Sequence, residues 1–138
     1  MLFRSEVLSP DNDADHWDVI EGQGSLFHPG YSAVTLGLLH GSQPDAFVVC
    51  HAAGRQFVEA FPEFPLPDIP QLIEHTVVCG RLTNAAIRCV GVSINTIDMD
   101  AADRDAYLQG IADQTGLPCV DPVATGVAPI VDYIEKNF

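Results

Sequence analysis

Short apolar runs alternate with segments of helical character along this chain, and no other feature of the sequence constrains the fold as strongly. The runs are mostly continuous, which is typical of strands that are covered on both faces of a sheet. Four of them predict strands: WDVIE at 17–21, AFVVCH at 46–51, RCVGVSIN at 88–95 and PCVD at 118–121.

The stretches between these runs have helical character. The predicted helices cover 31–41, 68–82, 100–116 and 126–137. Asp100 is placed to cap the third of them, and Gly116 with Pro118 to end it. One apolar stripe follows the rhythm of a buried helix face there: Tyr107, Leu108, Ile111 and Ala112. The proline-rich FPEFPLPDIP at 61–70 is incompatible with a helix or a central strand, so we predict a connecting loop.

Strand and helix in alternation predict right-handed crossovers and therefore an α/β fold, a doubly wound parallel sheet with helices on both faces. The residues before the first predicted strand contain no strand and helix of their own. We therefore expect residues 1–14 to be a disordered or arbitrary leader and 15–138 to form one α/β domain. The first unit of the sheet is then missing, which predicts a fragment truncated upstream of Asp15.

Composition excludes several classes of partner. The 138 residues are 47% hydrophobic, enough for one domain with a real core. Six Lys and Arg against 19 Asp and Glu give a net charge of −13, so nucleic acid is not expected as a partner. The apolar runs are too short to cross a bilayer and no signal peptide is evident, which predicts a cytoplasmic protein without a membrane partner.

The cysteines have no metal-site or disulfide spacing. They are separated by 29, 10 and 30 positions in apolar contexts: Cys50, Cys79, Cys89 and Cys119. Buried free thiols explain them best.

The turn after the first predicted strand is one candidate ligand site. In a parallel α/β sheet, ligands bind outside the carboxyl ends of the strands, and Glu21 closes such a strand. Gly22 and Gly24 would let the backbone approach an anion closely, with Ser25 beside them. The two glycines would equally serve a sharp turn that leaves Glu21 in water. His28 would act either as a general base or as a hydrogen-bonded anchor of the loop.

Three further residues fall near the carboxyl ends of other strands. His51 and Arg55 are placed as a base and an anion clamp. Asn95 could present a side-chain amide to a purine edge, or merely cap its turn while Asp98 or Asp100 begins the next helix.

The run DVIEGQGSLFHPGYSAVTLGLLHGSQPDAFVVCH resembles the C-terminal domain of the D-glutamate N-acetyltransferase-like family, and the likeness continues from about Asp11 through NTIDMD and GLPCVDPVATG. The resemblance implies a P-loop NTPase-like domain behind an N-terminal Rossmann-like domain. It also implies a Walker A loop, GxxxxGK[ST], which this chain lacks together with its strand and helix.

Within P-loop folds, VIEGQG is similar to the EGxG turn of dethiobiotin synthetase and its relatives. That likeness implies that Glu21 is a Mg²⁺ ligand, direct or through water, and that Gly22, Gly24 and Ser25 flank phosphates. SINT would then lie at the base-recognising strand, which makes Asn95 a cofactor-binding residue.

The family resemblance implies an N-acyltransferase that acetylates the amine of D-glutamate or a related amino acid from acetyl-CoA. His28 or His51 would accept the proton, with Glu21 as a further catalytic residue. The amides of Gly24 and Ser25 would face the oxyanion, and Arg55 would bind the substrate carboxylate.

Two other functions stay open at this point. One is a ligase of the dethiobiotin synthetase type, which would use ATP and Mg²⁺. The other is a non-catalytic nucleotide-binding module. We expect the isolated fragment to be inactive, and the full-length protein to form a homo-oligomer because a truncated sheet exposes an edge and an apolar face.

Overall fold

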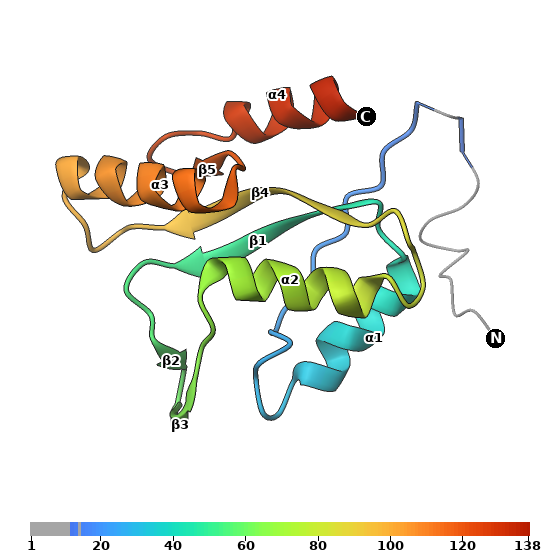
Figure 1. Cartoon of the computed structure of the whole chain (residues 1–138), viewed down its shortest axis with the longest axis horizontal. Helices are drawn as coiled ribbons and strands as arrows, with labels where there is room; N and C mark the ends of the chain where they lie inside the picture. Colours follow the sequence, from blue (N-terminus) through green and yellow to red (C-terminus); the bar gives the residue numbers. More distant parts are fainter. Residues whose placement is uncertain (1–11, 14) are drawn as a thin grey trace.

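The middle of the domain is a parallel sheet in the order β1-β4-β5 (Figure 1). The computed structural model describes residues 12, 13 and 15–138. The sheet strands are β1 (Ala46–Ala52), β4 (Arg88–Asn95) and β5 (Cys119–Val120), and β2 (Phe57–Val58) and β3 (Phe61–Pro65) form a separate antiparallel pair. The helices are α1 (Ser32–Ser42), α2 (Ile69–Gly80), α3 (Ala101–Thr115) and α4 (Ala128–Asn137).

Helices cover both faces of the sheet. Val49 of β1 pairs with Val92 of β4, whereas the preceding Val48 pairs with Gly91. Because neighbouring residues of a strand point to opposite faces, each pair marks a different face. Ile69 of α2, with Leu108 and Ile111 of α3, joins the core cluster on the Val49 face.

Helix α4 covers the other face, and Figure 1 shows it across β4 from α2. Ile130 of α4 packs directly over Gly91, where a Cβ atom would lie 2.7 Å from Ile130 Cγ1. On this face α4 covers β4 and β5, while Val48 and Cys50 of β1 are exposed. The predicted doubly wound α/β fold with helices on both faces is confirmed.

Local chemistry explains where the helices begin and end. Asp68 and Gln71 form a capping box at the start of α2, with Pro70 in its first turn. Asp100 caps α3 by accepting a hydrogen bond of 2.9 Å from the Asp103 backbone N–H, and Gly116 ends that helix at φ +68°. The predicted cap and the predicted end of this helix are both confirmed.

The expected strand at 17–21 is wrong. Residues 17–24 have no regular secondary structure and belong to no sheet, and the Val19 side chain is 93% exposed. A strand requires a hydrogen-bonded neighbour, and an apolar sequence alone does not supply one. Trp17 instead packs edge-on against Phe138 at the end of α4, with 5.7 Å between the ring centroids.

The expected loop at 61–70 is also wrong in its first half, because 61–65 form β3. Its partner β2 is only two residues long, and the turn between them places Ala60 at φ +65°. The prolines remain compatible with this short antiparallel pair, where few backbone N–H groups are needed.

The predicted leader 1–14 lies almost wholly outside the described residues. Within the residues that are described, no helix is both long enough and apolar enough to span a bilayer. The cysteines are free, as predicted, but Cys50 is exposed and only Cys89 is fully buried.

We predict that Gly91→Ala destabilises the domain by about 1–3 kcal/mol, the range for overpacking a core. The new Cβ would lie 2.7 Å and 2.8 Å from two carbon atoms of Ile130. Urea unfolding of the 138-residue chain measures the change. Gly110→Ala in α3 is the matched control, because a Cβ there meets no atom within 4 Å, and helix propensity then raises stability by about 0.5–1 kcal/mol. Equal stability of the Gly91→Ala variant and the parent would contradict the proposed packing.

Candidate functional site

A polar cavity opens where β1 and β4 end. It has a volume of about 140 Å³ and is lined by residues 52, 53 and 55 after β1 and by residues 95–99 after β4. The Ala53 N–H donates to the Asn95 carbonyl at 3.0 Å and joins the two strands at this point. The carboxyl ends of parallel strands are the usual place for a ligand in an open α/β sheet.

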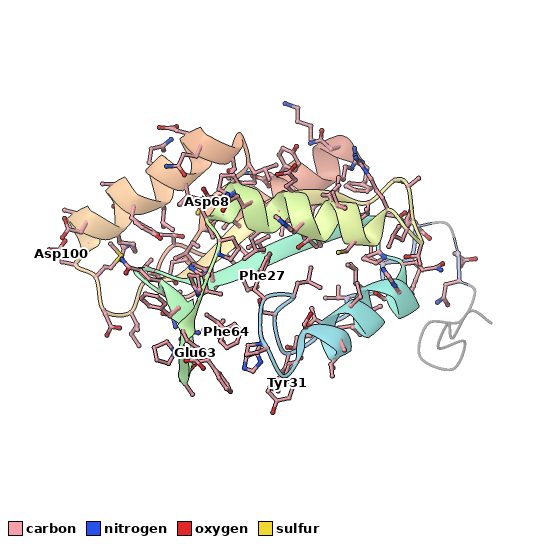
Figure 2. All side chains as sticks on the ribbon, turned by 60° about the horizontal axis from the view of Figure 1, so that its bottom comes forward. Phe27, Tyr31, Glu63, Phe64, Asp68 and Asp100 are labelled. Atoms are coloured by element: carbon pink, nitrogen blue, oxygen red, sulfur yellow. The ribbon has the colours of Figure 1, made fainter. Side chains whose placement is uncertain are left out.

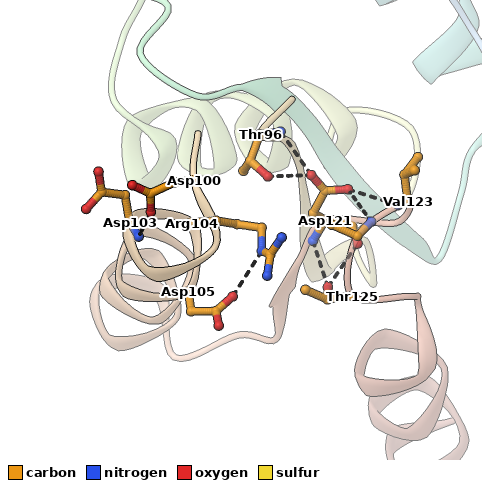
Figure 3. A network of polar contacts seen from close by, with 9 residues as sticks. Thr96, Asp100, Asp103, Arg104, Asp105, Asp121, Val123 and Thr125 are labelled. Atoms are coloured by element: carbon orange, nitrogen blue, oxygen red, sulfur yellow. Dashed lines mark hydrogen bonds and ion pairs between the residues drawn. The ribbon is translucent and has the colours of Figure 1, made fainter. Parts of the chain in front are cut away.

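Asp121 holds the end of β4 in place from the end of β5 (Figure 3). One carboxylate oxygen accepts hydrogen bonds from the Thr96 N–H at 3.0 Å and the Thr96 hydroxyl at 2.5 Å. The other accepts from the backbone N–H groups of Val123 at 2.9 Å and Ala124 at 3.0 Å. Thr96 and Asp121 are both buried, so this network is shielded from water.

The same hydrogen bonds stabilise the ionised form of Asp121. Those from the Thr96 hydroxyl and the Ala124 backbone lower the pKa of Asp121 far below its ordinary value, although burial opposes this. The Thr125 hydroxyl completes the turn, because it accepts from the Asp121 N–H and donates to the Asp121 carbonyl. Asp121 is therefore a positioning residue that stays charged, not a proton carrier.

His51 and Arg55 lie at the same end of β1. Burial, as the largest cause, lowers the pKa of the half-buried His51 imidazole, and the charge of Arg55 adds to this while a hydrogen bond to the Arg55 backbone opposes it. His51 is thus neutral near pH 7 and can accept a proton. Arg55 lines the cavity, and its Nη2 lies 3.4 Å from Glu59 Oε2 in an exposed ion pair.

Asn95 and Asp98 line the opposite side of the cavity. The Asn95 side-chain oxygen accepts a hydrogen bond of 3.0 Å from the Ile97 N–H, so the turn-capping role considered from sequence is present. Its amide nitrogen is left to donate elsewhere. Among the described residues, the exposed Asp98 carboxylate has neither a hydrogen-bond nor an ion-pair partner.

The glycine turn packs along α1. A Cβ on Gly22 would lie 1.9 Å from Leu38 Cδ2, and one on Gly24 would lie 2.8 Å from Thr35 Oγ1. Gly24 also has φ +99°, a backbone conformation that favours glycine. Close packing of the loop on the helix therefore explains both glycines, while Glu21 before them is exposed.

His28 anchors the start of α1. Its Nδ1 accepts hydrogen bonds from the N–H groups of Gly30 at 3.0 Å and Tyr31 at 3.2 Å, and the Ser25 hydroxyl accepts from Phe27 N–H at 3.2 Å. The imidazole ring also contacts Phe61 of β3, with centroids 5.3 Å apart. This geometry supports the loop-anchor role, because the lone pair that a base needs is already used.

A partly exposed row of aromatic rings extends from this anchor. Tyr31 and Phe64 lie at the same end of the molecule in Figure 2. The ring of His28 contacts both Tyr31 and Phe61, and Phe61 contacts Phe64. The predicted site residues thus fall into two groups. Those from 21 to 28 lie with α1 and the β2–β3 pair, and His51, Arg55 and Asn95 lie at the carboxyl ends of β1 and β4.

The residues needed for a tight Mg²⁺ site are not assembled. Within the part of the chain that is described, no three His, Cys, Asp or Glu side chains come together as metal ligands. Mg²⁺ can be held by one or two carboxylates when substrate phosphates and water supply the other oxygens. Glu21 as a Mg²⁺ ligand stays a prediction, and no chemical step is derived from it.

A second hollow of about 250 Å³ lies between α3, β5 and α4. Cys119 lines it, and burial raises the pKa of this thiol to about 11. The thiol is therefore protonated at neutral pH and is a poor nucleophile.

Two residues at or near the cavity, Asp98 and Asp121, are not among the site residues predicted from sequence. Asp121 was included only as the end of a strand, and Asp98 only as a possible helix start. The available signal was an acidic residue directly after a buried apolar run, as in CVD at 119–121.

The architecture and the position of the cavity define a parallel α/β domain with a candidate site at the carboxyl ends of its strands. The family model described as a domain of unknown function (DUF1611_C), P-loop domain, matches residues 5–131. The chain belongs to this DUF1611 family, and the family resemblance predicted from sequence is confirmed.

Relatives support the same assignment. The chain is 44% identical over 127 residues to a D-glutamate N-acetyltransferase from a Pseudoalteromonas species, covering 92% of this chain and 38% of the relative. It is 42% identical over 129 residues to the D-glutamate N-acetyltransferase of Tritonibacter scottomollicae, covering 94% and 39%. The chain thus spans about two fifths of the length of these relatives.

A solved structure agrees with the fold. The crystal structure of a DUF1611 family protein from Anabaena variabilis superposes with a TM-score of 0.79 at 35% identity. The superposition covers 85% of this chain and 34% of that one.

We predict that Asp121→Asn lowers the free energy of unfolding by about 2–3 kcal/mol at pH 7. An amide presents two donors on one side, so either the Thr96 N–H or the N–H groups of Val123 and Ala124 lose their acceptor, which costs about 1–3 kcal/mol for each buried group. Urea unfolding measures the difference.

The pH dependence of that difference tests the cause. A pKa lowered in the folded state gives stability that is present above the unfolded value of about 3.9 and is lost as the pH falls below it. The difference in the free energy of unfolding between the parent and Asp121→Asn should therefore narrow below about pH 4. Asp132→Asn on the exposed side of α4 is the matched control. A gap independent of pH would contradict the proposed role of the charge.

Proposed function

We propose that this chain is a domain of an N-acetyltransferase that transfers the acetyl group of acetyl-CoA to the amine of D-glutamate or a related amino acid. The observation that supports this most directly is the identity of 44% and 42%, over more than nine tenths of the chain, to two proteins named D-glutamate N-acetyltransferase. The fold alone does not select this activity, because P-loop architectures serve many reactions.

The reaction requires three things of the protein. The acceptor amine must lose a proton so that its nitrogen can attack the thioester carbonyl carbon, and both substrates must be held together. The carbon–sulfur bond then breaks as the amide bond forms, and the CoA thiolate leaves and takes up a proton. Hydrogen-bond donors aimed at the carbonyl oxygen would lower the barrier further.

Residues at the end of β1 suit the first two requirements. His51 is neutral near pH 7 because burial lowers its pKa, so it would act as the general base. Arg55, which lines the cavity, would bind a carboxylate of the acceptor. His28 is the weaker candidate for the base, since its Nδ1 already accepts two backbone hydrogen bonds.

The glycine turn has a less specific role in this proposal. The N–H groups of Gly24 and Ser25 would contact the oxyanion or the phosphates of CoA, as the resemblance implies. The ligase alternative would place ATP and Mg²⁺ at the same turn, near Glu21. The description of the family as a P-loop domain is the observation that favours this alternative.

A chimera tests the activity. The aligned 127 residues of the Pseudoalteromonas enzyme are replaced by this chain, and CoA release from acetyl-CoA is followed with and without D-glutamate. We expect release that depends on D-glutamate and is indifferent to ATP and Mg²⁺. Turnover only with ATP, or formation of ADP, would contradict the acetyltransferase and favour the ligase.

The base is tested in the same chimera. His51→Gln should lower kcat/KM by about 10²–10⁴-fold, because glutamine cannot accept the proton. In the parent chimera, the acid limb of the kcat/KM profile should lie below about pH 6.5, since the pKa of His51 is lowered. His75→Gln, at an exposed position of α2, is the matched control. Full activity of a correctly folded His51→Gln chimera would remove this residue from the mechanism.

A further inference from the structure

The cavity between the ends of β1 and β4 has charges of opposite sign on its two sides. Arg55 contributes a guanidinium from the β1 side, and Asp98 contributes a carboxylate from the β4 side. Each is presented by the residues that directly follow a strand of the same sheet. Without a bound metal ion, a carboxylate here would repel the phosphates of a nucleotide, whereas a ligand with both an ammonium and a carboxylate matches the two sides.

Among the described residues, neither Asp98 nor Arg55 forms a strong ion pair. The Asp98 carboxylate is exposed and, among the described residues, has no hydrogen-bond or ion-pair partner. The Arg55 guanidinium contacts Glu59 at 3.4 Å in a pair whose side chains are 46% and 81% exposed. Exposed pairs of this kind contribute little stability, so a ligand carboxylate can replace Glu59.

A third polar group is already oriented. The hydrogen bond from Ile97 N–H fixes the side-chain oxygen of Asn95, and its amide nitrogen is then available as a donor. The Asp121 network holds Thr96, the next residue, through both its N–H and its hydroxyl. The side of the cavity formed by 95–98 is therefore preorganised, which lowers the entropic cost of binding.

Size also selects the ligand. At about 140 Å³ the cavity is much smaller than the sites that enclose drug-sized ligands and nucleotides. The small side chains of Ala52 and Ala53 and the apolar Ile97 and Met99 complete its lining. A single amino acid, with one ammonium and at least one carboxylate, matches both the volume and the charges.

We propose that this cavity is the subsite of the acceptor amino acid, in which Asp98 binds the ammonium and Arg55 and Asn95 bind a carboxylate. The proposal rests on the proposed function and adds the position of the acceptor and a residue, Asp98, that recognises its amine. Acetyl-CoA would then approach from outside the cavity, and the bound ammonium would lose a proton to the general base before the nitrogen attacks.

Binding to the 138-residue chain provides the first test, by calorimetry with D-glutamate, glutarate and 4-aminobutyrate. Glutarate lacks the ammonium, and 4-aminobutyrate lacks the α-carboxylate. We expect the parent to prefer D-glutamate to glutarate by about tenfold or more, the effect of one charge-assisted hydrogen bond. Asp98→Asn should abolish that preference, whereas Arg55→Gln should weaken the binding of D-glutamate and of glutarate to a similar extent.

Matched variants control for charge and folding. Asp103→Asn removes the same charge from the first turn of α3 without lining the cavity, and it should leave the preference unchanged. Glu59→Gln releases Arg55 from its ion pair and should tighten binding of D-glutamate or leave it unchanged. Unfolding curves establish that each variant is folded.

Kinetics in the chimera provide the second test. Asp98→Asn should raise the KM for D-glutamate by about tenfold or more and change the KM for acetyl-CoA less than about twofold. A rise in the KM for acetyl-CoA alone would assign the cavity to CoA and overturn the proposal. Equal binding of D-glutamate and glutarate by the parent, or no binding of either, would also overturn it.

The two tests separate this proposal from the proposed function. If the chimera turns over D-glutamate but Asp98→Asn leaves both KM values unchanged, the activity stands and the acceptor site lies elsewhere. If the chimera has no acetyltransferase activity but the 138-residue chain binds D-glutamate through Asp98, the cavity is an amino-acid site of a different enzyme, and the acceptor role is overturned.

Discussion

One buried carboxylate holds together the edge of the sheet where the candidate site lies. Asp121 accepts hydrogen bonds from three backbone N–H groups and one hydroxyl, and these groups come from the end of β4 and from the turn after β5. β5 contributes only two residues to the sheet, so the backbone hydrogen bonds between β4 and β5 alone connect the ends of these strands weakly. The shielded network supplies the missing connection, and the shape of the cavity beside Thr96 depends on it.

This arrangement separates positioning from chemistry. Asp121 is buried and ionised at neutral pH, whereas the groups that would meet a ligand are accessible. Asn95 and Asp98, one and two residues from Thr96, lie on one side of the cavity, and Arg55 lies on the other. A rigid second layer beneath exposed polar groups is how proteins fix the geometry of a binding site. The glycine turn is different, because its contacts with α1 already account for its sequence.

Among the described residues, helices cover the two faces of the sheet unevenly. Helices α2 and α3 cover one face of the sheet across β1 and β4, but on the other face α4 leaves Val48 and Cys50 exposed. Within the described residues β1 is also paired on one side only, with β4. The relatives are more than twice as long as the matched region, and the proposed activity is therefore tested in the context of such a longer protein.

The sequence by itself determined the class of fold, since continuous apolar runs and capped helices depend on local patterns. β4 at 88–95 and the start of α3 after Asp100 were predicted correctly for this reason. Local pattern also placed His51, Arg55 and Asn95 near strand ends. Only the tertiary structure decided which of these residues share a cavity, because this depends on strand order and register.

Tertiary structure also decided where the local pattern failed. WDVIE at 17–21 has the composition of a strand, yet it joins no sheet, because a strand needs a neighbouring strand that a local pattern cannot specify. His28 could have been a base or an anchor from its sequence context, and its two backbone hydrogen bonds favour the anchor. Asp121 shows the same limit, because a lone aspartate reveals its importance only when its partner, Thr96, is 25 residues away in the chain and adjacent in space.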